Sequence, residues 1–138
     1  MAINIRQKVE IYTDDDRWGS TSDFTIPQQA TFDLIGAILS EYSFSATHHG
    51  AVITSFEGIM GAGLGSSGAF AVCLIGALQK RWGNEIDRTS IANQAYKIEV
   101  QKLGWHGGRQ DQYASAFGGF NLLEIGEKTN VIRLPREQ

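Results

Sequence analysis

The sequence predicts a domain that mixes helices with strands, and three segments carry that prediction. Residues 3–11 alternate apolar and polar side chains, which is the period of a half-buried strand. Residues 68–78 are apolar on every side, which is typical of a helix buried at the centre of a domain. Residues 120–125 and 130–134 flank a polar turn and predict a final pair of strands.

Apolar spacing and turn residues predict the remaining elements. In chain order these are a helix over 27–43, a strand over 51–56, a helix that runs from a Thr89 or Ser90 cap to about Leu103, and a short helix over 111–117. Pro27 suits the first turn of a helix because proline lacks the N–H that would be unpaired there. A glycine-rich turn, Gly61 to Gly65, leads into the buried helix.

Composition narrows the class of protein. The chain has 138 residues, a formal net charge of −3 and no basic block, which argues against nucleic acid or an anionic membrane as a partner. It has one cysteine, Cys73, so no disulfide framework is expected. No apolar run reaches the roughly 20 residues that span a bilayer. We expect a single domain over 1–138 in the cytoplasm.

The segment Gly61-Ala62-Gly63-Leu64-Gly65-Ser66-Ser67-Gly68 lies between a predicted strand and the buried helix. Glycines without Cβ atoms permit close approach of a ligand to the backbone, and the start of a helix favours an anion. The segment has no lysine after its glycines, so it is not a Walker-type loop, and its spacing differs from the dinucleotide fingerprint. The alternative is a tight turn with a serine N-cap.

Glu99, Arg109 and Asp111 are the other candidate site residues. Glu99 lies near the C-terminal end of a helix, where the dipole disfavours a carboxylate, so a compensating magnesium ion would explain it. The alternative is an exposed glutamate paired with Lys97 or Lys102. Asp111 is a candidate base for a hydroxyl proton, with Arg109 beside it to stabilise charge; its alternative role is a helix N-cap.

Two segments resemble one enzyme family. Residues 61–67 resemble the second signature of the GHMP kinases, and Gly108-Arg109-Gln110-Asp111-Gln112-Tyr113-Ala114 with Ala116 to Gly119 is similar to the heptose-phosphate kinase and fucokinase-like branch. The resemblance covers about Ala2 to Leu134. It implies an α+β fold of the ribosomal-protein-like type, with a mixed β-sheet backed by helices and a left-handed βαβ crossover. It also implies transfer of a phosphoryl group from ATP, with Mg²⁺, to a hydroxyl of a sugar or sugar phosphate.

The resemblance assigns roles by position. The residues that would surround the ATP phosphates are Gly61, Gly63, Leu64, Gly65, Ser66 and Ser67. Ser67 and Glu99 would hold the magnesium ion. Asp111 would be the catalytic aspartate, and Arg109 the basic residue close to it.

The sequence departs from the family pattern in three ways. The first signature, the third signature and the C-terminal domain are absent, and Met60 stands where relatives usually have proline. We therefore expect an incomplete N-terminal domain, truncated at both ends. An alternative function stays open here: a catalytically inactive domain that binds nucleotide or self-associates into a homo-oligomer through exposed apolar surface.

Overall fold

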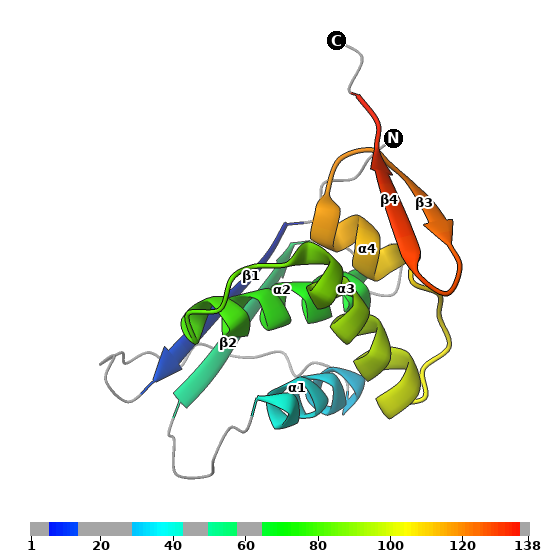
Figure 1. Cartoon of the computed structure of the whole chain (residues 1–138). Coiled ribbons are helices and arrows are strands. Elements are labelled where there is room, and N and C mark those ends of the chain that lie inside the picture. Colours follow the sequence, from blue (N-terminus) through cyan, green and yellow to red (C-terminus); the bar gives the residue numbers. More distant parts are fainter. Residues whose placement is uncertain (1–5, 14–28, 43–49, 58–64, 136–138) are drawn as a thin grey trace.

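The computed structural model describes residues 6–13, 29–42, 50–57 and 65–135 (Figure 1). The elements, in chain order, are β1 (Arg6–Thr13), α1 (Gln29–Glu41), β2 (Gly50–Glu57), α2 (Ser66–Arg81), α3 (Arg88–Tyr96), the π-helical segment η1 (Lys97–Lys102), α4 (Gln110–Phe117), β3 (Asn121–Ile125) and β4 (Thr129–Arg133). Each helix and strand predicted from the sequence is present. Within these ranges, no helix has the length and apolar character needed to cross a bilayer.

The strands form two antiparallel pairs. Arg6 of β1 lies opposite Glu57 of β2, with α1 in the connection, whereas β3 and β4 form a hairpin with Asn121 opposite Arg133. The combination of helices with antiparallel strands confirms the α+β class. The described strands contain no parallel pairing, so the predicted mixed sheet and left-handed βαβ crossover have no counterpart among them.

Helix α2 lies at the centre of the domain, as its all-apolar sequence predicts. No residue between 68 and 78 is exposed. The buried apolar side chains come from α1, α2, α3 and η1: Leu34, Ala37, Ile38, Phe70, Ala71, Leu74, Ile75, Leu78, Ile91, Ala95 and Ile98. In Figure 1 the helices form a layer in front of the β1–β2 pair, and α4 carries the β3–β4 hairpin at one end.

Helix α3 begins two or three residues earlier than predicted. Its N-cap is Asp87, whose carboxylate accepts hydrogen bonds from the backbone N–H groups of Thr89 (3.1 Å) and Ser90 (3.2 Å). The expected Thr89 or Ser90 cap is therefore wrong, because both residues donate to the cap from inside the helix. An aspartate at this position satisfies two of the N–H groups that the first turn leaves unpaired.

Polar contacts hold α1 against the α3–η1 helix. The Tyr42 hydroxyl donates to Gln94 Oε1 (3.0 Å), and burial raises the pKa of the Tyr42 phenol, so the donor proton is retained. Lys102 Nζ donates to the Ala37 carbonyl (3.2 Å) and to Ser40 Oγ (2.7 Å) at the end of α1. The helix layer is thus linked at its edge as well as through its core.

The buried face of α2 predicts a stability experiment. Leu74→Ala should lower the free energy of unfolding by about 2–5 kcal/mol, since Leu74 is 0% exposed and its loss leaves a cavity. Urea unfolding followed by circular dichroism measures the change. Lys80→Ala, on the exposed side of the same helix, should change it by no more than about 0.5 kcal/mol. Equal effects of the two substitutions would contradict the central position of α2.

Candidate functional site

The start of α2 is the end of the glycine-rich segment. Gly65 is the N-cap residue and has φ 72° and ψ 26°, in the left-handed region that glycine adopts most readily. Glycine has no side chain, and Ser66 and Ser67 are already helical, so the alternative of a serine N-cap is wrong. The first N–H groups of a helix have no partner within it, and this end favours an anion. Gly61, Gly63 and Leu64 lie outside the described residues.

Asp111 lies directly against this helix start. A Cβ atom built on Gly65 would stand 2.9 Å from Asp111 Cγ and 3.1 Å from Oδ1. A Cβ built on Gly68 would stand 3.1 Å from Asp111 Cβ. The two glycines therefore allow the first turn of α4 to approach the first turn of α2. The structure brings together Asp111 and Gly65, which are 46 positions apart in the chain (111 − 65).

Asp111 does not cap its own helix. The N-cap of α4 is Arg109, with no side-chain cap bond, and Asp111 is the second helical residue. The alternative explanation of Asp111 as an N-cap is therefore wrong. A carboxylate in the first turn still gains from the helix dipole. Its carboxylate lies close to Gly65 at the start of α2, and the residue is exposed.

Glu99 is buried, with 3% of its surface exposed. Its Oε2 accepts a hydrogen bond of 2.6 Å from Gln112 Nε2, and Gln112 directly follows Asp111. The alternative of an exposed glutamate paired with Lys97 or Lys102 is wrong, since Lys102 forms its ion pair with Glu41. Glu99 lies in η1, and π-helical turns occur often at functional sites. The Gln112 bond connects Glu99 to the turn that carries Asp111.

Arg109 points toward α3 and the hairpin. Its guanidinium lies 4.9 Å from the centroid of the Tyr96 ring, and Nη1 donates to Thr129 Oγ1 at 3.3 Å. Among residues with described side chains it forms no ion pair with Asp111. Its two contacts instead fix the N-terminal end of α4 relative to α3 and β4.

Two buried side chains fix the remainder of α4. Tyr113 is 0% exposed, its hydroxyl donates to Asn93 Oδ1 at 2.9 Å, and its ring is stacked with that of Phe117. Gln112 is 5% exposed and reaches Glu99. Two consecutive residues therefore attach α4 to the α3–η1 helix, which keeps the preceding Asp111 in position.

Comparison with known proteins places this geometry in a family. The model of the GHMP kinases N terminal domain matches residues 33–119, which is more than half of the chain. The chain belongs to the GHMP kinase family. In this GHMP kinase domain, the matched region includes α2 with its glycine start, Glu99 and Asp111.

Individual relatives are heptose phosphate and mevalonate kinases. The chain is 43% identical over 75 residues to D-glycero-alpha-D-manno-heptose 7-phosphate kinase of Campylobacter jejuni, a match that covers 54% of this chain and 22% of that enzyme. It is 44% identical over 68 residues to mevalonate kinase of Pyrococcus furiosus, covering 49% of this chain and 20% of that enzyme.

A solved structure gives the same result for the fold. The crystal structure of a D-glycero-D-manno-heptose 1-phosphate kinase from Bacteroides thetaiotaomicron superposes with a TM-score of 0.72 at 25% identity. The match covers 96% of this chain and 48% of that one. This GHMP kinase domain therefore corresponds to about half of that kinase and to about a fifth of the two enzymes above in the matched segments.

The residues near Glu99 suit a magnesium ion. In the described part of the chain, no cationic side chain pairs with Glu99, and Gln112 Oε1 is buried without a hydrogen-bond partner. A buried carboxylate is costly without a compensating charge. No group of three His, Cys, Asp or Glu side chains forms a complete metal site among these residues. Magnesium bound together with phosphates needs only one or two protein carboxylates, so the donor set fits.

Two residues that help to form the site, Gln112 and Gly68, were not predicted from the sequence. The role of Gln112 as the partner of Glu99 has no pattern of its own, because the two residues are brought together only by packing. Gly68 had a signal, since a glycine inside a helical pattern often marks a close approach of another backbone. The structure shows this approach at 3.3 Å from a Cβ on Gly68 to the Gln112 backbone nitrogen.

The contact between Gly65 and Asp111 predicts energetic coupling. Gly65→Ala should cost more stability than Gly83→Ala, because both glycines have φ 72° but only Gly65 has a neighbour within 4 Å. Gly83→Ala should cost about 1–2 kcal/mol from the left-handed backbone alone. In the double variant Gly65→Ala/Asp111→Ala, the loss in free energy of unfolding should be smaller than the sum of the two single losses by about 0.5–3 kcal/mol. Urea unfolding measures all three losses. Strict additivity of the two substitutions would show that these residues are not in contact.

Proposed function

We propose that this domain catalyses transfer of the γ-phosphoryl group of ATP to a hydroxyl of a sugar or sugar phosphate. The observation that carries the proposal is the Asp111 carboxylate beside Gly65 and Gly68 at the start of α2. This arrangement sets a proton acceptor next to an anion-binding helix end. Membership of the GHMP kinase family supports the reaction class, and the heptose phosphate kinase relatives support a phosphorylated sugar as the acceptor.

The glycine-rich segment is assigned to the nucleotide phosphates. Backbone N–H groups of Gly61, Gly63, Leu64 and Gly65, with the hydroxyls of Ser66 and Ser67, would surround the polyphosphate. The N-terminal turn of α2 adds its partial positive charge. Ser67 and Glu99 would hold a magnesium ion, which would neutralise negative charge on the phosphates.

Asp111 is assigned to the acceptor hydroxyl. Its carboxylate orients the hydroxyl and takes its proton as the new bond between oxygen and the γ-phosphorus forms and the bond to the leaving ADP oxygen breaks. Positioning and charge stabilisation account for most of the acceleration in phosphoryl transfer. Arg109 is assigned to stabilise the transferred group, which requires its guanidinium to leave Tyr96 and Thr129. We place the reaction in the cytoplasm.

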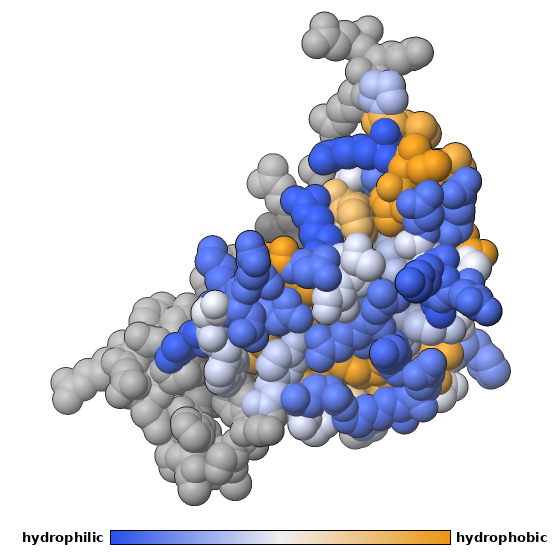
Figure 2. Space-filling model, in the orientation of Figure 1, coloured by the Kyte–Doolittle hydropathy of each residue, from blue (hydrophilic) through white to orange (hydrophobic). Residues whose placement is uncertain are grey.

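A second candidate function is a domain that self-associates without turnover. Leu122 and Ile132 are cross-strand partners on the β3–β4 hairpin, and they are 50% and 40% exposed. Figure 2 shows apolar surface gathered over this hairpin. Sedimentation velocity distinguishes the two candidates when combined with an ADP-release assay: oligomers that bind nucleotide and release no ADP would favour the second.

Asp111→Asn should lower turnover far more than nucleotide affinity. The amide keeps the size of the side chain but cannot accept the hydroxyl proton, so kcat should fall by about 10²–10⁴-fold. A coupled ADP assay with heptose phosphates gives kcat, and calorimetry with a non-hydrolysable ATP analogue gives Kd.

Asp87→Asn is the matched control for this substitution. Asp87 is an aspartate at the start of another helix, α3, where it caps N–H groups, and asparagine caps a helix about as well as aspartate. Its kcat should equal that of the parent chain. Unchanged turnover in Asp111→Asn would remove Asp111 from the mechanism.

Glu99→Gln should abolish the effect of magnesium on nucleotide binding. The parent chain should bind the ATP analogue at least about tenfold more tightly with magnesium than without it, a difference of about 1.4 kcal/mol, because the ion offsets the charge of the buried carboxylate. The variant should bind equally in both conditions. Glu41→Gln, which removes a surface carboxylate paired with Lys102, should retain the magnesium effect. A retained effect in Glu99→Gln would exclude Glu99 as a ligand.

A further inference from the structure

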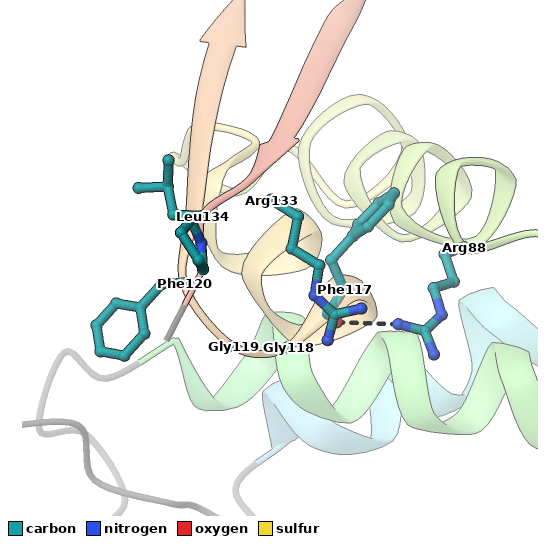
Figure 3. A pocket seen from close by; sticks show the side chains of 8 residues that line it. Arg88, Phe117, Gly118, Gly119, Phe120, Arg133 and Leu134 are labelled. Atoms are coloured by element: carbon teal, nitrogen blue, oxygen red, sulfur yellow. Dashed lines mark hydrogen bonds between the residues drawn. The ribbon is translucent and has the colours of Figure 1, made fainter. Parts of the chain in front are cut away.

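A concave region lies at the end of α4 that is remote from Asp111. A pocket of about 670 Å³ lies between the C-terminal end of this helix and the base of the β3–β4 hairpin (Figure 3). Its lining includes Arg88, Arg133, Phe117, Gly119, Phe120 and Leu134. The volume is in the range of pockets that hold small organic ligands. None of the residues assigned to phosphoryl transfer lines it.

Two guanidinium groups converge on this pocket. Arg88 Nη1 donates to the Phe117 carbonyl oxygen at 2.9 Å. Arg133 Nη2 lies 3.8 Å from the position that a Cβ on Gly119 would occupy. Figure 3 shows both side chains directed to the space beside Gly118 and Gly119, from α3 and β4 respectively. Among the described residues no acidic side chain lines the pocket, and neither arginine is in an ion pair.

The helix dipole explains only part of this arrangement. Cations are favoured at the C-terminal end of a helix, and Arg88 satisfies one of the last carbonyl groups of α4. The dipole does not require a second arginine beside the first, because like charges repel. It also does not account for the exposed apolar walls, where Phe120 is 57% and Leu134 is 46% exposed.

We propose that this pocket binds a phosphate monoester that carries an apolar or aromatic group. Two guanidinium groups without an acidic neighbour match the charge of a dianionic phosphate, and their N–H groups match its oxygens. The apolar part of the ligand would pack on Phe120 and Leu134. Gly119 has φ 77°, in the left-handed region that glycine adopts most readily. The proposal is independent of the phosphoryl-transfer function, because it uses different residues.

A calorimetric titration of the full chain with phenyl phosphate tests the site. The parent chain should bind with one site per chain. Arg133→Gln and Arg88→Gln should each raise Kd by at least about tenfold, since hydrogen bonds to a charged group are lost. Lys128→Gln removes one positive charge at the hairpin turn, away from the pocket, and should leave Kd unchanged. Thermal unfolding confirms that each variant is folded.

Further titrations separate the two parts of the ligand. Benzoate, with one negative charge, should bind more weakly than phenyl phosphate. Phe120→Ala should weaken the binding of phenyl phosphate but not the binding of inorganic phosphate. Magnesium and ADP in excess should not displace phenyl phosphate, because the nucleotide is assigned to the other end of α4.

Three results would overturn the proposal. The first is no binding of phenyl phosphate to the parent chain. The second is an unchanged Kd in both arginine variants, which would place the anion elsewhere. The third is displacement by magnesium and ADP, which would assign the bound phosphate to the glycine-rich segment.

Discussion

The first turn of α4 lies against the first turn of α2, and this contact is possible because Gly65 and Gly68 have no side chains. A Cβ on Gly65 would meet Asp111 Cγ at 2.9 Å, and a Cβ on Gly68 would meet Asp111 Cβ at 3.1 Å. Two helix starts, each with unpaired N–H groups, therefore lie close together. The partial positive charges of both favour anions at the same place, and Asp111 already supplies one. The remaining parts of the site are arranged around this contact.

The short helix α4 has eight residues, and such helices are marginal alone, so its position relies on packing. Tyr113 and Gln112 supply this packing. Their side chains form hydrogen bonds with Asn93 and Glu99 on the α3–η1 helix. Arg109 adds contacts to Tyr96 and Thr129 at the helix start. Loss of any of these contacts would allow Asp111 to move relative to Gly65. The same contacts therefore serve both the stability of α4 and the geometry of the site.

Periodicity predicts the elements well here because each has a strong apolar pattern. The buried helix over 68–78 and the strand pair near the C-terminal end were predicted from that pattern, and the structure has them as α2, β3 and β4. The Asp87 cap was missed because three neighbouring polar residues can all cap a helix, and only the fold selects one. The burial of Glu99 and its bond to Gln112 depend on how α4 packs on η1, and no local pattern encodes that contact. Motif resemblance supplied the site residues that periodicity could not.

The negative charges of the proposed site affect how it can bind a polyphosphate. Asp111 faces the helix start that is assigned to polyphosphate, and Glu99 is connected to Asp111 through Gln112. Two carboxylates near a polyphosphate repel it, and the repulsion is strong where water is partly excluded. The dipoles of two helix starts offset only part of this repulsion, since each is equivalent to about half a charge. A divalent cation held by Ser67 and Glu99, as proposed, would offset this repulsion. In the proposed reaction, the charges of the domain would therefore favour a bound magnesium ion, as those of ATP would.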